Sequence, residues 1–261
     1  MKKSADTQAI KIIFNADDFG ICRAVNYGIL DAFRLGVVRS TSLMATGDAY
    51  EHAVEIAQSF ADLDIGVHLS LTHGQPITAR VSSMLNAQGQ FISLAQFNEI
   101  KGKLDIAAIE EEFTAQIEKI LASGLKPTHL DSHHHIHMMA SLFPLALKLA
   151  KKYKLAIRLR SRSQLPQEYS DLVSPELLME EFYGDQLTED QLAEILYIHE
   201  GKTSSLEIMC HPGYLDTFLN THSSYSSQRI NELNILTDPK LRQVIETFGA
   251  ELISYAQLTA Q

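Results

Sequence analysis

The sequence predicts an α/β fold, specifically a distorted, TIM-like (β/α) barrel of about seven to eight parallel strands. Short apolar runs alternate with longer segments of helical periodicity, as expected for a parallel sheet with crossover helices. Units of this kind, repeated seven or eight times, close naturally into a barrel; an open, doubly wound sheet is the alternative. The 261 residues contain no long linker rich in Pro, Ser or Gly, so residues 1–261 are expected to form a single domain.

The expected elements follow in chain order. Apolar runs of strand length predict strands at Ile10–Asn15, Thr41–Thr46, Ile65–Leu71, Thr128–His133, Ala156–Arg160, Leu206–Cys210 and Glu251–Tyr255. Apolar residues at helical spacing predict helices at Val25–Leu35, Tyr50–Phe60, Ile106–Ala122, Leu142–Tyr153 and Thr188–His199. Gly36 suits the end of the first helix, and Thr188 with Gln191 forms a capping-box pattern at the start of the last.

Two stretches without periodicity, His73–Ser93 and Pro212–Ser227, are expected to be loops at the mouth of the barrel. Tyr214, Tyr225 and Phe91 in these loops are candidates for apolar contact with a ligand, with ordinary packing as the alternative for each.

Composition excludes several functions. The net charge is −10 and the chain has no basic stripe, so binding to nucleic acid or to an anionic membrane is not expected, whereas a neutral sugar is permitted. The glycine-rich motifs of dinucleotide-binding and P-loop proteins are absent. The N-terminus lacks the apolar core of a secretory signal and no stretch reaches transmembrane length, so a cytoplasmic location is expected. Cys22 and Cys210 are expected to be small buried hydrophobic residues.

Ionisable residues stand where the expected strands end. Asp17 and Asp18 follow the first strand in NADDFG, and because strand side chains alternate, the two carboxylates can point to different faces. One can then bind a metal while the other handles a proton. His68 in GVHLSLT shares a strand face with Ser70 and Thr72. An acidic turn and an ordinary polar strand residue are the respective alternatives.

The segment THLDSHHHIHM is the most distinctive in the chain. His129, Asp131 and His133 share one strand face by their spacing of two. More histidines follow where the strand should give way to a loop, at His134, His135 and His137. Histidine clusters of this density are typical of metal sites, and Asp131 can accept the second ring N–H of a ligating histidine.

Two further strand ends complete the pattern. Pro212 cannot continue a strand ladder, so His211 in LEIMCHPG lies at the end of its strand. Arg158 and Arg160 in IRLRSR share a face, and a buried arginine needs a carboxylate partner. Barrel active sites form at the carboxyl ends of the strands, so these motifs together predict one carboxylate–histidine metal site.

The motifs NADDFG, GVHLSLT, PTHLDSHHHIHM and LEIMCHPG, in this order and spacing, resemble those of the YdjC-like carbohydrate deacetylases. The similarity is closest to bacterial chitooligosaccharide (chitin disaccharide) deacetylases and runs from about Ile10 to Tyr255. It includes NYGI at 26–29 and VVRSTSLM at 37–44. PTHLDSHHHIHM is highly specific for this family, whereas NADDFG alone is moderately so.

The resemblance implies a (β/α) barrel that hydrolyses the acetamido group of chitobiose-type sugars with one divalent metal ion, Mg²⁺ or Zn²⁺. Carried over by motif position, the implied metal ligands are Asp18, His68 and His133. Asp17 then matches the base and His211 the acid. Arg158 matches an arginine of the family and is expected, with Asp17 and His211, among the catalytic residues; its carboxylate partner is left open. The implied partner is a small oligosaccharide, and a homodimer is what the family suggests.

Two alternatives from other functional classes remain open at this stage. A barrel phosphoesterase also uses histidine and aspartate ligands, but would usually need a second metal and more basic residues near the phosphate. A metal- or sugar-binding protein without catalysis would carry the same residues and show no turnover.

Overall fold

The computed structural model describes residues 9–185, 187–199 and 201–258. Residues 1–8, which include most of the N-terminal segment considered above, lie outside the described residues. Over the described part of the chain, eight strands pair in one sheet and each pairing is parallel. The strands are β1 (Lys11–Phe19), β2 (Ser40–Leu43), β3 (Asp64–Leu69), β4 (His129–Ser132), β5 (Ala156–Ile157), β6 (Leu177–Met179), β7 (Ser205–Cys210) and β8 (Glu251–Leu252).

The sheet is centred on β1, its longest strand. The order is β5-β4-β3-β2-β1-β7-β6, and β8 also pairs with β1. The first residues of β1, Lys11 and Ile12, pair with β8, whereas β2 pairs with β1 from Asn15 to Phe19. Strand β1 therefore pairs with strands from both the first and the last part of the chain. Its last residues include Asp17 and Asp18 of the predicted site.

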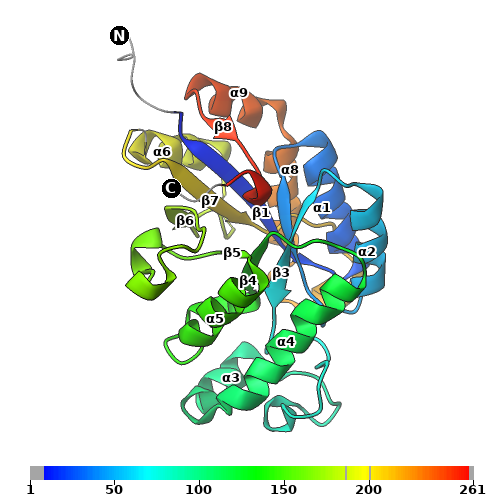
Figure 1. Cartoon of the computed structure of the whole chain (residues 1–261). Coiled ribbons are helices and arrows are strands. Elements are labelled where there is room, and N and C mark those ends of the chain that lie inside the picture. Colours follow the sequence, from blue (N-terminus) through cyan, green and yellow to red (C-terminus); the bar gives the residue numbers. More distant parts are fainter. Residues whose placement is uncertain (1–8, 186, 200, 259–261) are drawn as a thin grey trace.

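The sheet curls into an incomplete barrel, with the helices outside the strands (Figure 1). Its edge strands, β5 and β6, do not form a parallel ladder with each other. Instead, the segment after β5 makes an antiparallel bridge between Ser161 and Leu177, and the Leu178 N–H donates to the Arg160 carbonyl at 3.1 Å. The predicted distorted (β/α) barrel is confirmed, and the distortion lies at this junction.

The helices agree best with the prediction where apolar periodicity is strong. They are α1 (Arg23–Leu35), α2 (Tyr50–Ser59), α3 (Leu94–Ile100), α4 (Ile106–Ala122), α5 (Phe143–Tyr153), α6 (Glu189–His199), α7 (Thr217–His222), α8 (Ser227–Thr237) and α9 (Pro239–Thr247). Of these, α4 has the predicted ends. No helix within the described ranges is long and apolar enough to cross a membrane.

Four helices and one strand were not predicted: α3, α7, α8, α9 and β6. The strand β6 has three residues, too few to show a period. Helix α8 turns Arg229 and Glu232 inward alongside leucines and isoleucines, so its buried face does not form an apolar stripe. Where a buried face is polar for a functional reason, hydrophobic periodicity fails as a signal.

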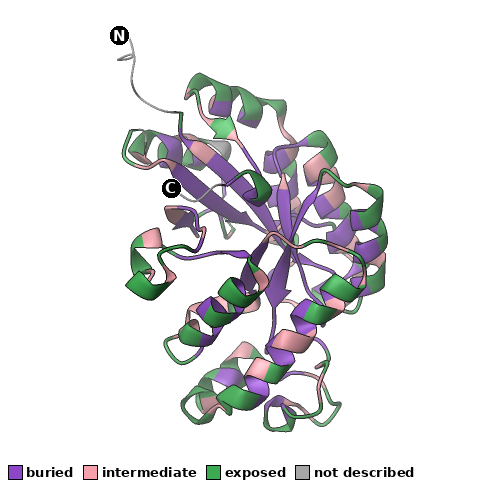
Figure 2. Ribbon diagram, in the orientation of Figure 1, coloured by how far each residue is buried: buried purple, intermediate pink, exposed green. Residues whose placement is uncertain are grey.

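The barrel interior changes character along its length. Strands and inward helix faces are buried, while outer helix faces are exposed (Figure 2). At the amino ends of the strands, a small apolar cluster includes Ile13, Ala156 and Tyr255. Above it lies a layer of buried polar side chains that includes Arg158 and Glu207. This polar layer supports the site at the carboxyl ends.

We expect Gly28→Ala to destabilise the protein. A Cβ on Gly28 in α1 would lie 2.5 Å from the Cα of Gly213, in the loop that follows β7. Such overpacking costs about 1–3 kcal/mol, measurable as a lower midpoint of urea unfolding. The matched control is Gly102→Ala, where a Cβ meets nothing within 4 Å. Equal unfolding midpoints for the two variants would contradict the prediction, because they would show that α1 and this loop can move apart without loss of stability.

Candidate functional site

Most of the predicted site residues line one cavity at the carboxyl ends of the strands. The cavity has a volume of about 570 Å³. Its lining includes Asp17 and Asp18 from β1, His68 from β3, His133 after β4 and His211 after β7. Strand ends far apart in sequence therefore supply one site, in the position that barrel folds use for catalysis.

A bulge at the end of β1 brings both aspartates to this cavity. The pairing of β1 with β2 shifts register between Ala16 and Phe19, and Asp18 has a φ of 68°. Aspartate tolerates the left-handed region better than most residues do. The expected alternation of Asp17 and Asp18 to different faces was therefore wrong, because the bulge turns the second carboxylate back beside the first.

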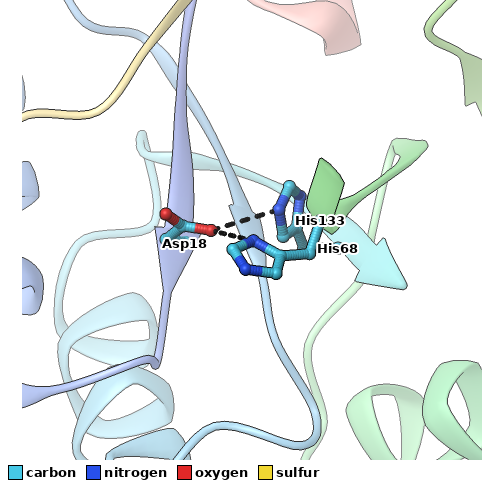
Figure 3. Close-up of side chains that lie close together, drawn as sticks. All are labelled: Asp18, His68 and His133. Carbon is cyan, nitrogen blue, oxygen red and sulfur yellow. Dashed lines mark hydrogen bonds and ion pairs between the residues drawn. The ribbon is translucent and has the colours of Figure 1, made fainter. Parts of the chain in front are cut away.

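Asp18, His68 and His133 form the candidate metal centre. Asp18 Oδ1 lies 2.8 Å from His133 Nδ1 and 3.3 Å from His68 Nε2 (Figure 3). One ligand atom from each of the three lies within 4.8 Å of the others. His68 Nε2 is buried and, apart from this 3.3 Å contact with Asp18, has no polar partner among the described residues, as expected of an atom that holds a metal. Three protein ligands of this kind fit a divalent ion that keeps open positions.

The ring of His68 is fixed from behind by Asp131. The carboxylate lies 2.7 Å from His68 Nδ1, and Ser42 Oγ lies 3.0 Å from the same nitrogen. Burial lowers the pKa of His68, but Asp131 and the other nearby carboxylates outweigh it and raise the pKa to about 10. The acceptor at Nδ1 directs Nε2 at Asp18, which is the arrangement that orients metal-ligating histidines.

Arg229 of α8 neutralises the other oxygen of Asp18. Its Nη2 donates to Asp18 Oδ2 at 2.5 Å, and both side chains are almost fully buried. Burial raises the pKa of Asp18, but His133 and Arg229 outweigh it and hold the pKa well below its usual range. Asp18 is thus an anion whose two oxygens have separate duties.

Arg158 is the hub of the polar layer below the cavity. It is fully buried and donates to both oxygens of Asp17 at 2.6 Å. The same guanidinium lies 3.0 Å from Asp131 and 2.7 Å from Glu207. Burial opposes ionisation of Asp17, but Arg158 outweighs it and lowers its pKa. Arg158, expected among the catalytic residues, does not line the cavity; its two hydrogen bonds position Asp17, which does.

Asp17, His68 and Asp131 also have ligand-type atoms within 4.8 Å of one another. Their atoms are already engaged: Asp17 by Arg158, and Asp131 by Arg158 and His68. This second group is therefore an ion-pair network and not a second metal centre.

His211 faces the cavity from the end of β7, with Tyr183 and Tyr225 packed against it. Its ring centroid lies 5.4 Å from that of Tyr183 and 5.5 Å from that of Tyr225. Burial lowers the pKa of His211 from the usual 6.5 to about 4, even though Asp17 and Asp18 raise it. The ring is therefore neutral at neutral pH.

The other histidines of THLDSHHHIHM have separate partners. His134 Nδ1 lies 2.8 Å from Thr72 Oγ1, and His135 Nε2 lies 3.2 Å from Glu180. His137 is buried between Ser132 and the Arg158 carbonyl. His129 stacks on Tyr255 with ring centroids 3.9 Å apart, inside the barrel and away from the cavity.

Both expected loops reach the cavity, but not through all of the predicted side chains. The first supplies His73 and Ser93, and the second, which contains α7, supplies Tyr225. Phe91 is instead buried in the core. Tyr214 lies outside the cavity lining and donates to Asp31 at 2.6 Å.

The residues near the site that were not singled out from the sequence include Arg229, Glu232, Tyr183 and Glu207. A signal existed for Glu207, which shares a strand face with His211 by its spacing of four. Arg229 and Glu232 lie on α8, whose polar buried face has no periodic signal. Arg160, expected to share the face of Arg158, instead pairs with Glu180 at the surface.

Comparison with known proteins gives consistent matches over nearly the whole chain. A sequence profile of the YdjC-like protein family matches residues 11–247. A carbohydrate deacetylase of Geobacillus stearothermophilus is 42% identical over 250 residues, covering 94% of this chain and 96% of that protein. A chitooligosaccharide deacetylase of Yersinia enterocolitica is 39% identical, covering 94% and 98%.

A solved structure from Enterococcus faecalis, named for a proposed cleavage of cellobiose phosphate, superposes with a TM-score of 0.87. It is 35% identical and covers 95% of this chain and 98% of its own. The similarity thus extends from sequence motifs to the arrangement of the whole fold.

We expect His133→Ala to weaken binding of a divalent ion by more than about 100-fold, beyond the 10–100-fold typical for loss of an outer-shell partner. Isothermal titration calorimetry with Zn²⁺ and with Mg²⁺ measures this. The matched control is His135→Ala, which removes a histidine that lines the same cavity but pairs with Glu180. It should bind one ion with wild-type affinity. An equal loss in both variants would contradict the assigned ligand set.

Proposed function

Since the chain belongs to the YdjC-like protein family, we propose that it is a metal-dependent carbohydrate deacetylase. It would remove the N-acetyl group from N-acetylglucosamine-containing oligosaccharides such as chitobiose and release acetate. The observation that carries the proposal is the Asp18–His68–His133 centre, with Asp17 and His211 lining the same cavity.

The bound metal would polarise the acetyl carbonyl and lower the pKa of water. Asp18, His68 and His133 would hold it. Zinc suits this ligand set, and magnesium is compatible if water completes its coordination. The pairing of Asp18 with Arg229 keeps the carboxylate ionised and ready as a ligand.

Asp17 would accept the proton of the attacking water. Arg158 fixes its carboxylate by two hydrogen bonds and keeps it ionised at neutral pH. Asp17 Oδ1 accepts from both Arg158 and Asn15, whereas Oδ2 accepts from Arg158 and retains a lone pair for a proton from the cavity side. The ion pair with Arg158 lowers the basicity of Asp17 but fixes the position of its carboxylate. A general base must first lie within hydrogen-bond reach of the proton that it accepts.

His211 would protonate the sugar nitrogen as the C–N bond breaks. An amine anion is too basic to leave, so the nitrogen must gain a proton before departure. His211 lines the cavity together with Asp17 and the candidate ligands. Its position supports the role, although its lowered pKa requires a source for the proton.

The cavity favours a neutral sugar over a phosphoester. Among the described residues that line it, Arg229 is the sole lysine or arginine, and it is already paired with Asp18. A phosphate would meet one cation there, whose charge already balances that of Asp18. The volume lies within the usual range for small-molecule sites.

The test is release of acetate from N,N′-diacetylchitobiose by the purified protein with Mg²⁺ or Zn²⁺. Parallel samples contain N-acetylglucosamine and diacetylchitobiose phosphorylated on a primary hydroxyl, because the name of the Enterococcus faecalis neighbour includes a phosphorylated disaccharide. We expect metal-dependent acetate release and no release of inorganic phosphate. Tight metal binding with no acetate from any of the sugars would overturn the proposal.

We expect Asp17→Asn to lower kcat by about 10² to 10⁴, the usual contribution of general base catalysis, while metal affinity is retained. Asparagine keeps the shape but cannot accept the proton, and Arg158 keeps Asp131 and Glu207 as partners. Acetate release and calorimetry measure the two effects separately. Wild-type kcat in this variant would exclude Asp17 as the base.

A further inference from the structure

The assigned acid, His211, has no proton to give in its resting state. Burial lowers its pKa to about 4, so the ring is neutral at neutral pH. A neutral ring that surrendered its Nε2 proton alone would become an imidazolate, which is strongly unfavourable. The second nitrogen must therefore receive a proton at the same time.

The second nitrogen, Nδ1, is poised for this. It is buried, and within the part of the chain that the structure describes it has no hydrogen-bond partner. The nearest carboxylate oxygen is Glu232 Oε1 of α8, at 3.9 Å. The flanking rings of Tyr183 and Tyr225 hold the imidazole between the cavity and Glu232.

Glu232 is built into this position. It is fully buried and does not line the cavity. It accepts a hydrogen bond from the His211 backbone N–H and another from the Tyr225 hydroxyl. The Tyr225 hydroxyl also accepts from the Gly184 N–H at 3.0 Å. The loop, the tyrosine and the carboxylate thus form one rigid unit.

Glu232 is suited to carry a proton at neutral pH. Burial raises its pKa to about 7, although the His211 N–H, Tyr225 and Arg229 lower it. Arg229 cannot fully compensate the carboxylate, because it is committed to Asp18. The other charged groups that act on the pair are Asp17, Asp18 and Arg158. The two aspartates are themselves neutralised by arginines.

We propose that the acid of the reaction is a His211–Glu232 pair, in which the Glu232 carboxyl replaces the proton that the His211 ring donates. The pair as a whole gives up one proton in each turnover. This rests on the deacetylase function proposed above. For the transfer, Glu232 Oε1 and His211 Nδ1 close from 3.9 Å to hydrogen-bond distance. As the C–N bond breaks, the Nε2 proton passes to the sugar nitrogen and the Glu232 carboxyl proton passes to Nδ1. The ring stays neutral and changes tautomer, and Glu232 becomes a carboxylate. The pair then regains one proton from solvent, and Asp17 releases to solvent the proton that it took from water.

The test is a double-mutant cycle of Glu232→Gln and His211→Asn, with acetate release followed across pH. Glu232→Gln should lower kcat at neutral pH by about 10²-fold, the lower end of an acid's contribution. The alkaline limb of kcat should move from near 7 toward 4, since only the proton of His211 remains. In the His211→Asn background, Glu232→Gln should cost nothing further. The matched control, Glu246→Gln on the exposed face of α9, should behave as wild type.

The same kcat loss for Glu232→Gln in both backgrounds, or an unmoved alkaline limb, would overturn the proposal. Rescue of kcat by Glu232→Asp is a further expectation, because a carboxyl group is restored.

A measurement without turnover separates this proposal from the proposed function. In the full-length chain loaded with Zn²⁺, NMR of ¹³C-labelled glutamate and ¹⁵N-labelled histidine should show Glu232 titrating near neutrality and His211 as a neutral ring that accepts at Nδ1. Glu232 ionised throughout, with His211 titrating alone, would contradict the pair even if acetate is released. The expected titration in a protein that deacetylates none of the sugars would leave the pair intact and reject the function.

Discussion

The buried guanidinium of Arg158 is the interaction on which the rest of the site depends. It is fully enclosed and shared by Asp17, Asp131 and Glu207, carboxylates from three different strands. Asp131 in turn fixes the ring of His68, so one cation positions both the candidate base and a candidate ligand. Carboxylates buried without such a partner are costly and tend to take up a proton. The polar layer of the barrel is therefore stable only as a unit, and the cavity rests on it.

The strands and helices that have a regular apolar pattern could be predicted from the sequence. Apolar runs gave most of the strands, and α4 was predicted with its observed ends. The motifs at the strand ends also brought Asp17, Asp18, His68, His133 and His211 to one cavity, because parallel strands end at the same side of a sheet. Periodicity carries this information wherever a segment has one apolar face.

The remainder depends on exceptions to periodicity. The bulge that turns Asp18 beside Asp17 reverses the rule of alternation, and no residue type demands it. Arg229 and Glu232 lie on the buried face of α8, where sequence patterns place apolar residues. The lowered pKa of His211 arises from tertiary burial and not from its neighbours in sequence. Functional polar groups in the core are therefore the least predictable from sequence alone.

The pairing of Asp18 with Arg229 joins residues 211 positions apart, and this has a consequence for how the protein is made. During synthesis, Asp18, His68 and His133 leave the ribosome well before α8 exists. Until α8 docks against α1, Asp18 lacks its counter-ion Arg229, and the His211 backbone N–H lacks its acceptor, the Glu232 carboxylate. The last fifth of the chain thus completes a centre whose candidate metal ligands lie between residues 18 and 133. A nascent or truncated chain would hold these candidate ligands without the finished site.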